Sequence, residues 1–287
     1  MEIRKSPYKA AWAGILIPGL GHWYAGSQKS AAVAFSVVTA LFGLGCVLAG
    51  HRVFAFTGHP FATTPLLQWI PIHVWPEVGN LGETMLLWLG QPELDPDRSR
   101  LLRLPIQTEH LGLALTGLSG GLNFMLAADA CWLVGRQNLS AERGRSIGGR
   151  PAFSVILAWL VPGLGHVREG RKATGIMIAA ALCLLYALGL GFSELNGVDR
   201  PQLYWLWAAQ TGMGGATLAA SVLLGPLEIS HRIETMDLGT TMLAICGLLN
   251  IVVLTDVYTL GETRALTEAG ICIQTEPEPS GRGAVEE

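Results

Sequence analysis

The sequence is poor in charge. Asp, Glu, Lys and Arg make up 14% of its 287 residues, and hydrophobic residues make up 50%. Soluble domains average about 25% charged residues. The mean hydropathy is +0.40, so the chain has too few charged side chains to cover a soluble surface. The composition excludes an ordinary soluble domain and indicates an integral membrane protein.

Catalytic and metal-binding signatures are also missing. The five cysteines are scattered without a C-x-x-C pair, so we interpret them as packing residues. No P-loop, H-E-x-x-H or G-x-G-D motif occurs, and the 19 Lys and Arg form no dense patch, which excludes nucleic acid as a partner. Gly117–Gly120 reads G-x-S-G, as in rhomboid-type intramembrane proteases, but no internal helix supplies an obvious histidine to face Ser119. We therefore expect a protein that is not an enzyme, with an intramembrane enzyme as a remote alternative.

Long apolar runs are abundant. A helix needs about 20 apolar residues to cross the hydrocarbon of a bilayer. The runs of this length are Ala31–Gly50, Ala173–Phe192 and Leu203–Leu227, which hold no charge, and Leu111–Val134 and Leu238–Leu260, each with one Asp. Together with shorter apolar segments they predict an all-α polytopic membrane helix bundle with about seven or eight membrane segments.

A five-residue run, P-G-L-G-H, occurs twice. It spans residues 18–22 and 162–166, and apolar residues precede both copies. A second pattern also recurs, in which an L-G pair is followed by Asn and then by Asp, ending at Asp129 in one half and at Asp256 in the other. Self-similarity of this kind is typical of a duplicated unit. We therefore expect two diverged repeats.

The spacing of these motifs divides the chain. We expect a first membrane repeat at 1–135 and a second at 152–261, joined by a basic cytoplasmic linker at 136–151. The first repeat holds an extra segment at about 51–110 that is rich in Pro and aromatic residues, which predicts an extramembrane insert. Residues 262–287 are acidic and contain Pro and Gly, which predicts a disordered tail.

The distribution of basic residues predicts the orientation. Short basic segments stay in the cytoplasm, and both the N-terminus and the linker are basic. The first half then crosses the membrane an even number of times, so the two repeats run parallel. Basic residues directly after the second P-G-L-G-H conflict with a full crossing there, so either that segment is re-entrant or the rule is overridden. The residues concerned are Arg168, Arg171 and Lys172.

The P-G-L-G-H turns are the first candidate site. Pro removes a backbone donor, and Gly permits tight turns and close helix approach. In a bilayer, an interrupted backbone must be satisfied by protein or water. His22 and His166 could cap the free carbonyl groups, which we favour, or could bind a haem or a metal. A metal site needs further ligands at defined spacing, and none is visible, so we expect no metal and treat both histidines as weak cofactor candidates.

Asp129 and Asp256 are the second candidate site. A carboxylate in an apolar helix is costly and is a functional candidate by default. Both are expected within a turn or two of a helix C-terminus, where the helix dipole disfavours negative charge. We favour interhelical hydrogen bonding over a proton or cation relay. The structural or relay candidates are Pro18, Gly19, Gly21, His22, Asn123 and Asp129 in the first half, and Pro162, Gly163, Gly165, His166, Asn250 and Asp256 in the second.

Residues 18–26, P-G-L-G-H-W-Y-A-G, resemble the P-G-x-G-x-x-Y-x-G hairpin of the bacterial TM-two-domain superfamily. In the second copy, Arg168 stands where that Tyr is expected. The closing L-G, Asn and Asp pattern is similar to an uncharacterised bacterial family of integral membrane proteins, and this chain looks like two fused units of it. The resemblance covers the helices of both halves and implies a hairpin between two membrane helices. It implies no activity.

These patterns predict a non-catalytic protein of the bacterial cytoplasmic (inner) membrane. We expect a structural or accessory subunit that packs in a larger complex, because small and aromatic residues are abundant and intramembrane charges are few. Its expected partners are membrane lipids and other integral membrane proteins. No cofactor is predicted, and a bound lipid or pigment at a complex interface stays open. The alternative is a small-solute or ion transporter or channel that uses the repeated Asp and His residues.

Overall fold

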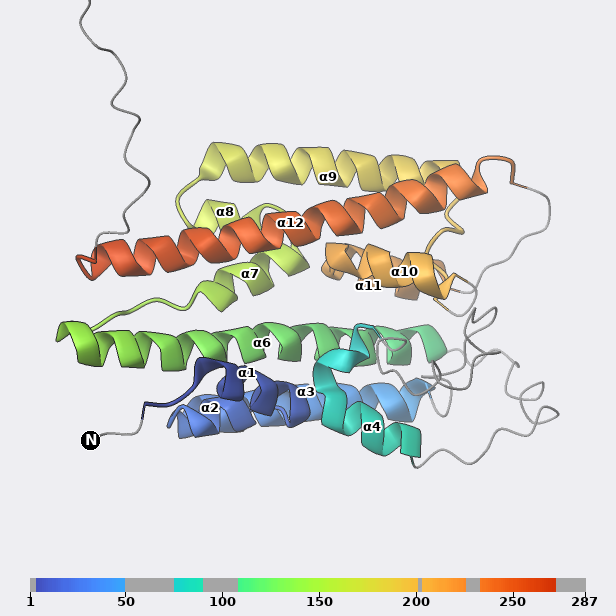
Figure 1. Ribbon diagram of the computed structural model, residues 1–287. Helices are drawn as coiled ribbons and strands as arrows, with labels where there is room; N and C mark the ends of the chain where they lie inside the picture. The colour runs from blue at the N-terminus through green and yellow to red at the C-terminus, as the bar shows by residue number, and fades with distance from the viewer. Residues whose placement is uncertain (1–3, 50–74, 90–107, 201–202, 226–232, 272–287) are drawn as a thin grey trace, which may run out of the picture.

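The computed structural model describes residues 4–49, 75–89, 108–200, 203–225 and 233–271 (Figure 1). Within these ranges every regular element is a helix. The first half contains α1 (Pro7–Leu16), α2 (Leu20–Tyr24), α3 (Gln28–Ala49), η4 (Glu77–Asn80), α4 (Leu81–Leu89) and α6 (Glu109–Arg143). The second half contains α7 (Pro151–Leu160), α8 (Leu164–Arg168), α9 (Lys172–Phe192), α10 (Tyr204–Gln210), η5 (Thr211–Met213), α11 (Gly215–Leu224) and α12 (Met236–Glu268).

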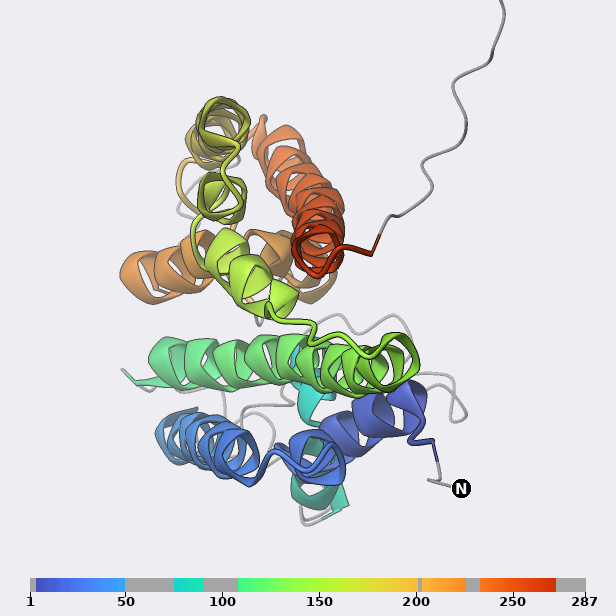
Figure 2. The same cartoon turned by 90° about the vertical axis from the view of Figure 1, so that its left-hand side faces the viewer.

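Four of these helices, α3, α6, α9 and α12, are long and apolar enough to cross a membrane. They run along one common direction (Figures 1 and 2). Exposed apolar side chains such as Val47 on α3 and Met177 on α9 cover their outer faces, which suits a lipid environment. The fold therefore fits an integral membrane protein. The other described helices are shorter, so the predicted count of seven or eight segments is not confirmed.

The P-G-L-G-H motifs turn the chain back on itself. α1 has ten residues, or about 15 Å, which is half of the ~30 Å hydrocarbon thickness. Gly19 then adopts a left-handed φ of +80°, α2 runs back, and the Ser6 amide donates to the Tyr24 hydroxyl at 3.1 Å. α7 and α8 have the same geometry, with Gly163 at a φ of +81°. Neither motif forms a full span, which favours the re-entrant alternative.

A second short hairpin enters each half from the opposite end (Figure 1). In the first half, α4 meets the tip of α1, where Gly82 lies against the carbonyl oxygen of Leu16. In the second half, α11 meets the tip of α7, where Gly215 lies against the carbonyl oxygen of Leu160. A side chain on either glycine would overlap that oxygen. Each half thus brings two opposed short hairpins together beside its two long helices.

The expected ends of the long helices were wrong. α6 continues past Asp129 to Arg143 and ends at Gly144, whose φ is +62°. α12 continues past Asp256 to Glu268, so neither aspartate lies near a helix C-terminus, and the linker and the tail both begin as helix. The apolar run stops before the helix does, as expected where a helix leaves the membrane. Beyond that point, residues with high helix propensity such as Arg, Gln, Leu, Ala and Glu keep the chain helical. Residues 272–287 of the tail lie outside the described residues.

The predicted extramembrane insert at 51–110 is described only at 75–89 and 108–110. Residues 75–89 do not stand apart from the bundle, because Glu77 and Asn80 are fully buried and Gly79 packs against the backbone of Gly120 in α6. That part of the prediction is wrong, since residues 77–80 form a buried turn that packs on α6 and leads into the half-exposed helix α4. The rest of the insert lies outside the described residues.

Candidate functional site

Each half contains a buried histidine paired with an aspartate. His22 Nε2 lies 3.0 Å from Asp129 Oδ2, and His166 Nε2 lies 2.9 Å from Asp256 Oδ2. The histidines sit on α2 and α8, the returning limbs of the hairpins, and the aspartates sit on the long helices α6 and α12. Each pair therefore fastens a hairpin to a long helix.

Small residues in the motif allow this approach. A Cβ added at Gly21 would lie 2.9 Å from the Cβ of Ala130 on α6. A Cβ added at Gly165 would lie 2.8 Å from Cγ1 of Val257 on α12. Both contacts are tighter than a real side chain tolerates, so glycine is needed for each histidine to reach its aspartate. Pro18 and Pro162 are buried at the two turns.

The two pairs differ in their surroundings. Arg150, in the segment before α7, donates to Asp129 through Nη2 at 2.5 Å and through Nε at 3.3 Å. The Asp129 side chain is 5% exposed, whereas that of Asp256 is 56% exposed. A residue of the linker thus pairs with the buried carboxylate of the first half. The sequence did not indicate this partner of Asp129.

Asn123 and Asn250 hold the interrupted backbone. Asn123 Nδ2 donates to the carbonyl oxygens of Gly14 at 2.9 Å and Gly79 at 2.8 Å. Asn250 Nδ2 donates to the carbonyl oxygen of Gly212 at 2.8 Å. Broken backbone at membrane depth must find such partners inside the protein. The asparagines are therefore placed to close the hairpin tips, a role that the sequence spacing did not indicate.

The histidines are poorly placed for a cofactor. Their side chains are 2% exposed for His22 and 0% for His166, and each ring commits its Nε2 to an aspartate. Across the described ranges, no group of three His, Cys, Asp or Glu side chains could hold a metal ion. The candidate residues thus form two separate pairs, one in each half.

Ser119 of the G-x-S-G segment is fully buried. Its hydroxyl donates to the carbonyl oxygen of Val38 at 2.8 Å and accepts from Asn80 Nδ2 at 2.6 Å. A serine nucleophile needs a general base within hydrogen-bond reach, and both of these Ser119 hydrogen bonds go to groups that are not bases. The segment instead packs α6 against α3 and η4.

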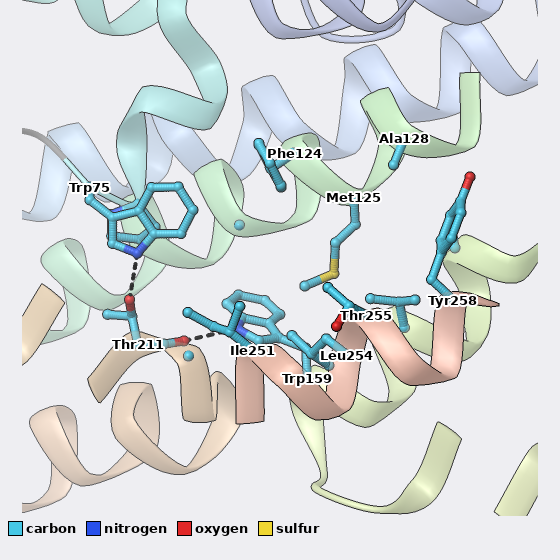
Figure 3. A pocket seen from close by; sticks show the side chains of 15 residues that line it. Trp75, Phe124, Met125, Ala128, Trp159, Thr211, Ile251, Leu254, Thr255 and Tyr258 are labelled. Carbon is cyan, nitrogen blue, oxygen red and sulfur yellow. Dashed lines mark hydrogen bonds between the residues drawn. The ribbon is translucent and has the colours of Figure 1, made fainter. Parts of the chain in front are cut away.

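A cavity of about 290 Å³ lies between the two halves (Figure 3). Phe124 and Met125 of α6 face Ile251 and Leu254 of α12 across it. At one end, Trp75 Nε1 donates to Thr211 Oγ1 at 2.8 Å. The lining is almost wholly apolar, so the cavity suits a hydrocarbon group and contains no pair of groups for acid–base chemistry.

A buried ion pair also joins the halves, and sequence reasoning missed it. Arg200 Nη1 lies 2.6 Å from Glu77 Oε1, with side chains 1% and 0% exposed. Thr116 donates to the same carboxylate oxygen at 2.7 Å, and the Arg200 guanidinium lies over the Trp207 ring at 4.9 Å. Glu77 was missed because its segment was assigned to the surface. The only signal was a pair of opposite charges in otherwise apolar surroundings.

A family comparison shows what this chain is related to. The model of DUF6677, described as a family of unknown function, matches residues 9–143 and 153–269. The chain belongs to this family. No curated protein and no solved structure matches it. Membership of DUF6677 transfers no activity, so the function has to be argued from the geometry.

The different surroundings of the two His–Asp pairs lead to a prediction. Asp129→Asn should lower the free energy of unfolding by about 1–3 kcal/mol, because it removes a buried acceptor of charge-assisted bonds from His22 and Arg150. Asp256→Asn should lower the free energy of unfolding by less than about 1 kcal/mol, because the carboxylate of Asp256 is half exposed. The measurement is equilibrium unfolding of both variants in mixed mild and denaturing detergent. Equal losses of stability in the two variants would contradict the stabilising pairing of Arg150 with Asp129.

Proposed function

We propose that this protein is a non-catalytic component of the bacterial inner membrane, a structural or accessory subunit that packs in a larger complex. We further propose that it is a duplicated unit of the TM-two-domain type, with the N-terminus and the linker in the cytoplasm. The basic N-terminus and linker support this orientation.

Matching contacts in the two halves support the duplication. A Cβ added at Gly45 of α3 would lie 2.7 Å from the carbonyl oxygen of Gly112. A Cβ added at Gly189 of α9 would lie 3.1 Å from the carbonyl oxygen of Gly239. Gly79 packs on the Gly120 backbone, and Gly212 packs on the Gly247 backbone. Gly239 follows Gly112 by 127 residues, the interval that also separates Gly247 from Gly120. Descent from one unit explains why the α6 and α12 partners of these contacts recur at one interval, while the intervals of Gly45 to Gly189 and of Gly79 to Gly212 differ because the segments between the motifs differ in length.

One observation carries the non-catalytic proposal. The His, Asp, Asn and Ser side chains that could have performed chemistry are used to close the fold. His22 and His166 hold the hairpins α1–α2 and α7–α8. Asn123 bonds to Gly14 of α1, Asn250 bonds to Gly212 of η5, and Ser119 joins α6 to α3. Buried polar groups that bond to specific partners in the fold favour one packing arrangement. A scaffold needs such a core, whereas a catalyst needs some of these groups to face a substrate.

The test is gentle detergent extraction of native membranes, followed by native electrophoresis, mass spectrometry and an absorption spectrum of the same band. We expect the chain to migrate in an assembly with other integral membrane proteins. Migration alone, or as a small homo-oligomer without a chromophore, would remove the accessory role. A chromophore in the band would overturn the expectation that no cofactor is bound.

A second candidate is transport, and the opposed hairpins favour it. Short broken helices that meet inside a bilayer occur in transporters, where their ends surround the solute. The test is proton or cation flux into liposomes containing the purified protein. A pH-dependent flux that Asp129→Asn abolishes and Asp256→Asn reduces would support transport. Absence of flux in the wild type, or a flux unchanged in both variants, would leave the scaffold as the better proposal.

A further inference from the structure

A second cavity, of about 570 Å³, lies along the seam between the two halves, on α6, α7 and α8. Three arginines line it, and they come from three different segments: Arg136 from α6, Arg150 from the linker and Arg168 from α8. A single carboxylate, that of Asp129, lines the same cavity. Three guanidinium groups against one carboxylate leave a positive cavity that would attract an anion.

The guanidinium groups are not all committed to the protein. Arg136 Nη1 donates to the Gly149 carbonyl oxygen at 2.9 Å, so it shapes the linker. Arg150 uses Nε and Nη2 for Asp129, and its side chain is 50% exposed. Arg168 lies over the Phe153 ring at 4.2 Å, and within the described part of the chain it has no hydrogen bond or ion pair. Arg150 and Arg168 therefore offer free N–H groups to one shared cavity.

Arg168 is also where the second motif departs from the hairpin pattern. In the first copy the corresponding residue is Tyr24, whose hydroxyl accepts from the Ser6 amide at 3.1 Å and closes the hairpin. In the second copy this closure is replaced by an exposed arginine stacked on an aromatic ring. The hairpin α7–α8 is instead closed by the Ser154 hydroxyl, which donates to the Glu169 carboxylate directly after α8. The arginine is thus not needed in the role that the tyrosine has in the first half.

The remaining wall of the cavity is apolar. Leu126 on α6 and Phe153 and Ile156 on α7 line it beside the arginines. The cavity lies towards the end of the bundle that carries the N-terminus, α8 and the end of α12 (Figure 1). That end is rich in Lys and Arg, as expected for the side that faces anionic lipid headgroups. A polar cationic part and an apolar wall together fit an amphiphile better than a free inorganic anion.

We propose that this cavity binds the phosphodiester headgroup of an anionic phospholipid between Arg150 and Arg168, with the start of its acyl chains against Leu126, Phe153 and Ile156. The planar guanidinium group matches two phosphate oxygens at once. Because the arginines come from the linker and α8 while Asp129 and Leu126 belong to α6, the bound lipid contacts both halves. This site is independent of whether the protein is an accessory subunit.

The test is native mass spectrometry of the purified full chain with defined amounts of phosphatidylglycerol or phosphatidylcholine. We expect the wild type to retain phosphatidylglycerol preferentially and Arg168→Gln to weaken that binding about tenfold, as expected for losing a hydrogen bond to a charged group. Arg171→Gln is the matched control, because it removes the same charge three residues away from an exposed position outside the cavity. It should leave the preference unchanged.

Three results would overturn the proposal. They are a wild type without preference for phosphatidylglycerol, an equal loss in Arg168→Gln and Arg171→Gln, and displacement of the lipid by low-millimolar inorganic phosphate. The last would identify a site for free phosphate. If Arg168→Gln fails to fold, Arg168→Lys replaces it, since it keeps the charge but not the planar fork. A several-fold loss of lipid in that variant supports the site, and an unchanged affinity contradicts it.

Discussion

Arg200→Ala is expected to destabilise the protein by about 3–5 kcal/mol, the range for removing one partner of a buried ion pair. The substitution leaves the Glu77 carboxylate 0% exposed and without the guanidinium that lies 2.6 Å away. Thr116 would remain as a neutral donor at 2.7 Å, which cannot compensate a buried charge. Loss of this ion pair would also weaken the contact between the two halves, because Glu77 belongs to the first half and Arg200 to the second. Equilibrium unfolding in mixed detergent micelles measures the effect.

Two controls separate the charge effect from lost packing. Arg4→Ala removes an arginine whose ion pair with Glu142 is exposed, with side chains 63% and 46% exposed, so the free energy of unfolding should change little. The double variant Glu77→Gln, Arg200→Met removes both charges and keeps much of the volume, so it should recover most of the stability lost in Arg200→Ala. If the double variant is as unstable as the single one, packing on Trp207 is the main contribution of Arg200, and the unpaired-charge explanation is wrong.

The sequence predicted the hairpin turns because their chemistry is local. Pro18 and Gly19 at the end of a short apolar segment leave the chain few options other than reversal. The long helices were also predictable, since Gln28–Ala49 and Lys172–Phe192 match apolar runs. Membrane character follows from composition. These features depend on neighbouring residues and need no knowledge of the partners in space.

The partners of the polar residues could not be predicted for a physical reason. His22 and Asp129 are 107 positions apart, and their contact depends on how α2 packs against α6. The role of Asn123 requires the carbonyl groups of Gly14 and Gly79 to arrive from two opposed hairpins. Without the fold, Asn and Asp in an apolar helix look like isolated polar groups. The sequence marks them as candidates, and their hydrogen-bond partners are visible only once the hairpins are in place.

The glycine contacts at the hairpin tips are equally invisible in sequence. The small residues of G-L-S-G-G favour a packing face over a catalytic segment, and Gly120 and Gly121 are buried in α6. Gly120 lies against the carbonyl group of Pro76, and Gly121 lies against the Trp159 ring of the other half. Small residues allow backbones to approach closely in membrane helices. Which glycine makes such a contact depends on how each helix is rotated about its own axis, and the packing of the folded protein sets that rotation.

Gly120→Ala is therefore expected to lower the free energy of unfolding by about 1–3 kcal/mol or more, because the added Cβ would overlap the backbone of Pro76 and Glu77. Backbone atoms cannot rotate away as a side chain can, so η4 would have to move from α6. Gly43→Ala on α3 is the matched control, because an added Cβ there meets nothing within 4 Å. It should be neutral, or stabilising by up to about 1 kcal/mol through reduced chain entropy.

Gly247→Ala extends this experiment to the second half, where the added Cβ would overlap the carbonyl group of Ala209. If the two halves descend from one unit and keep the same close approach, Gly120→Ala and Gly247→Ala should cost similar amounts while Gly43→Ala does not. A large loss of stability for Gly120→Ala with none for Gly247→Ala would mean that the end of α10 can shift where η4 cannot. The tight contact would then be a requirement of the first half alone, and the duplicated contacts would not be equivalent in energy.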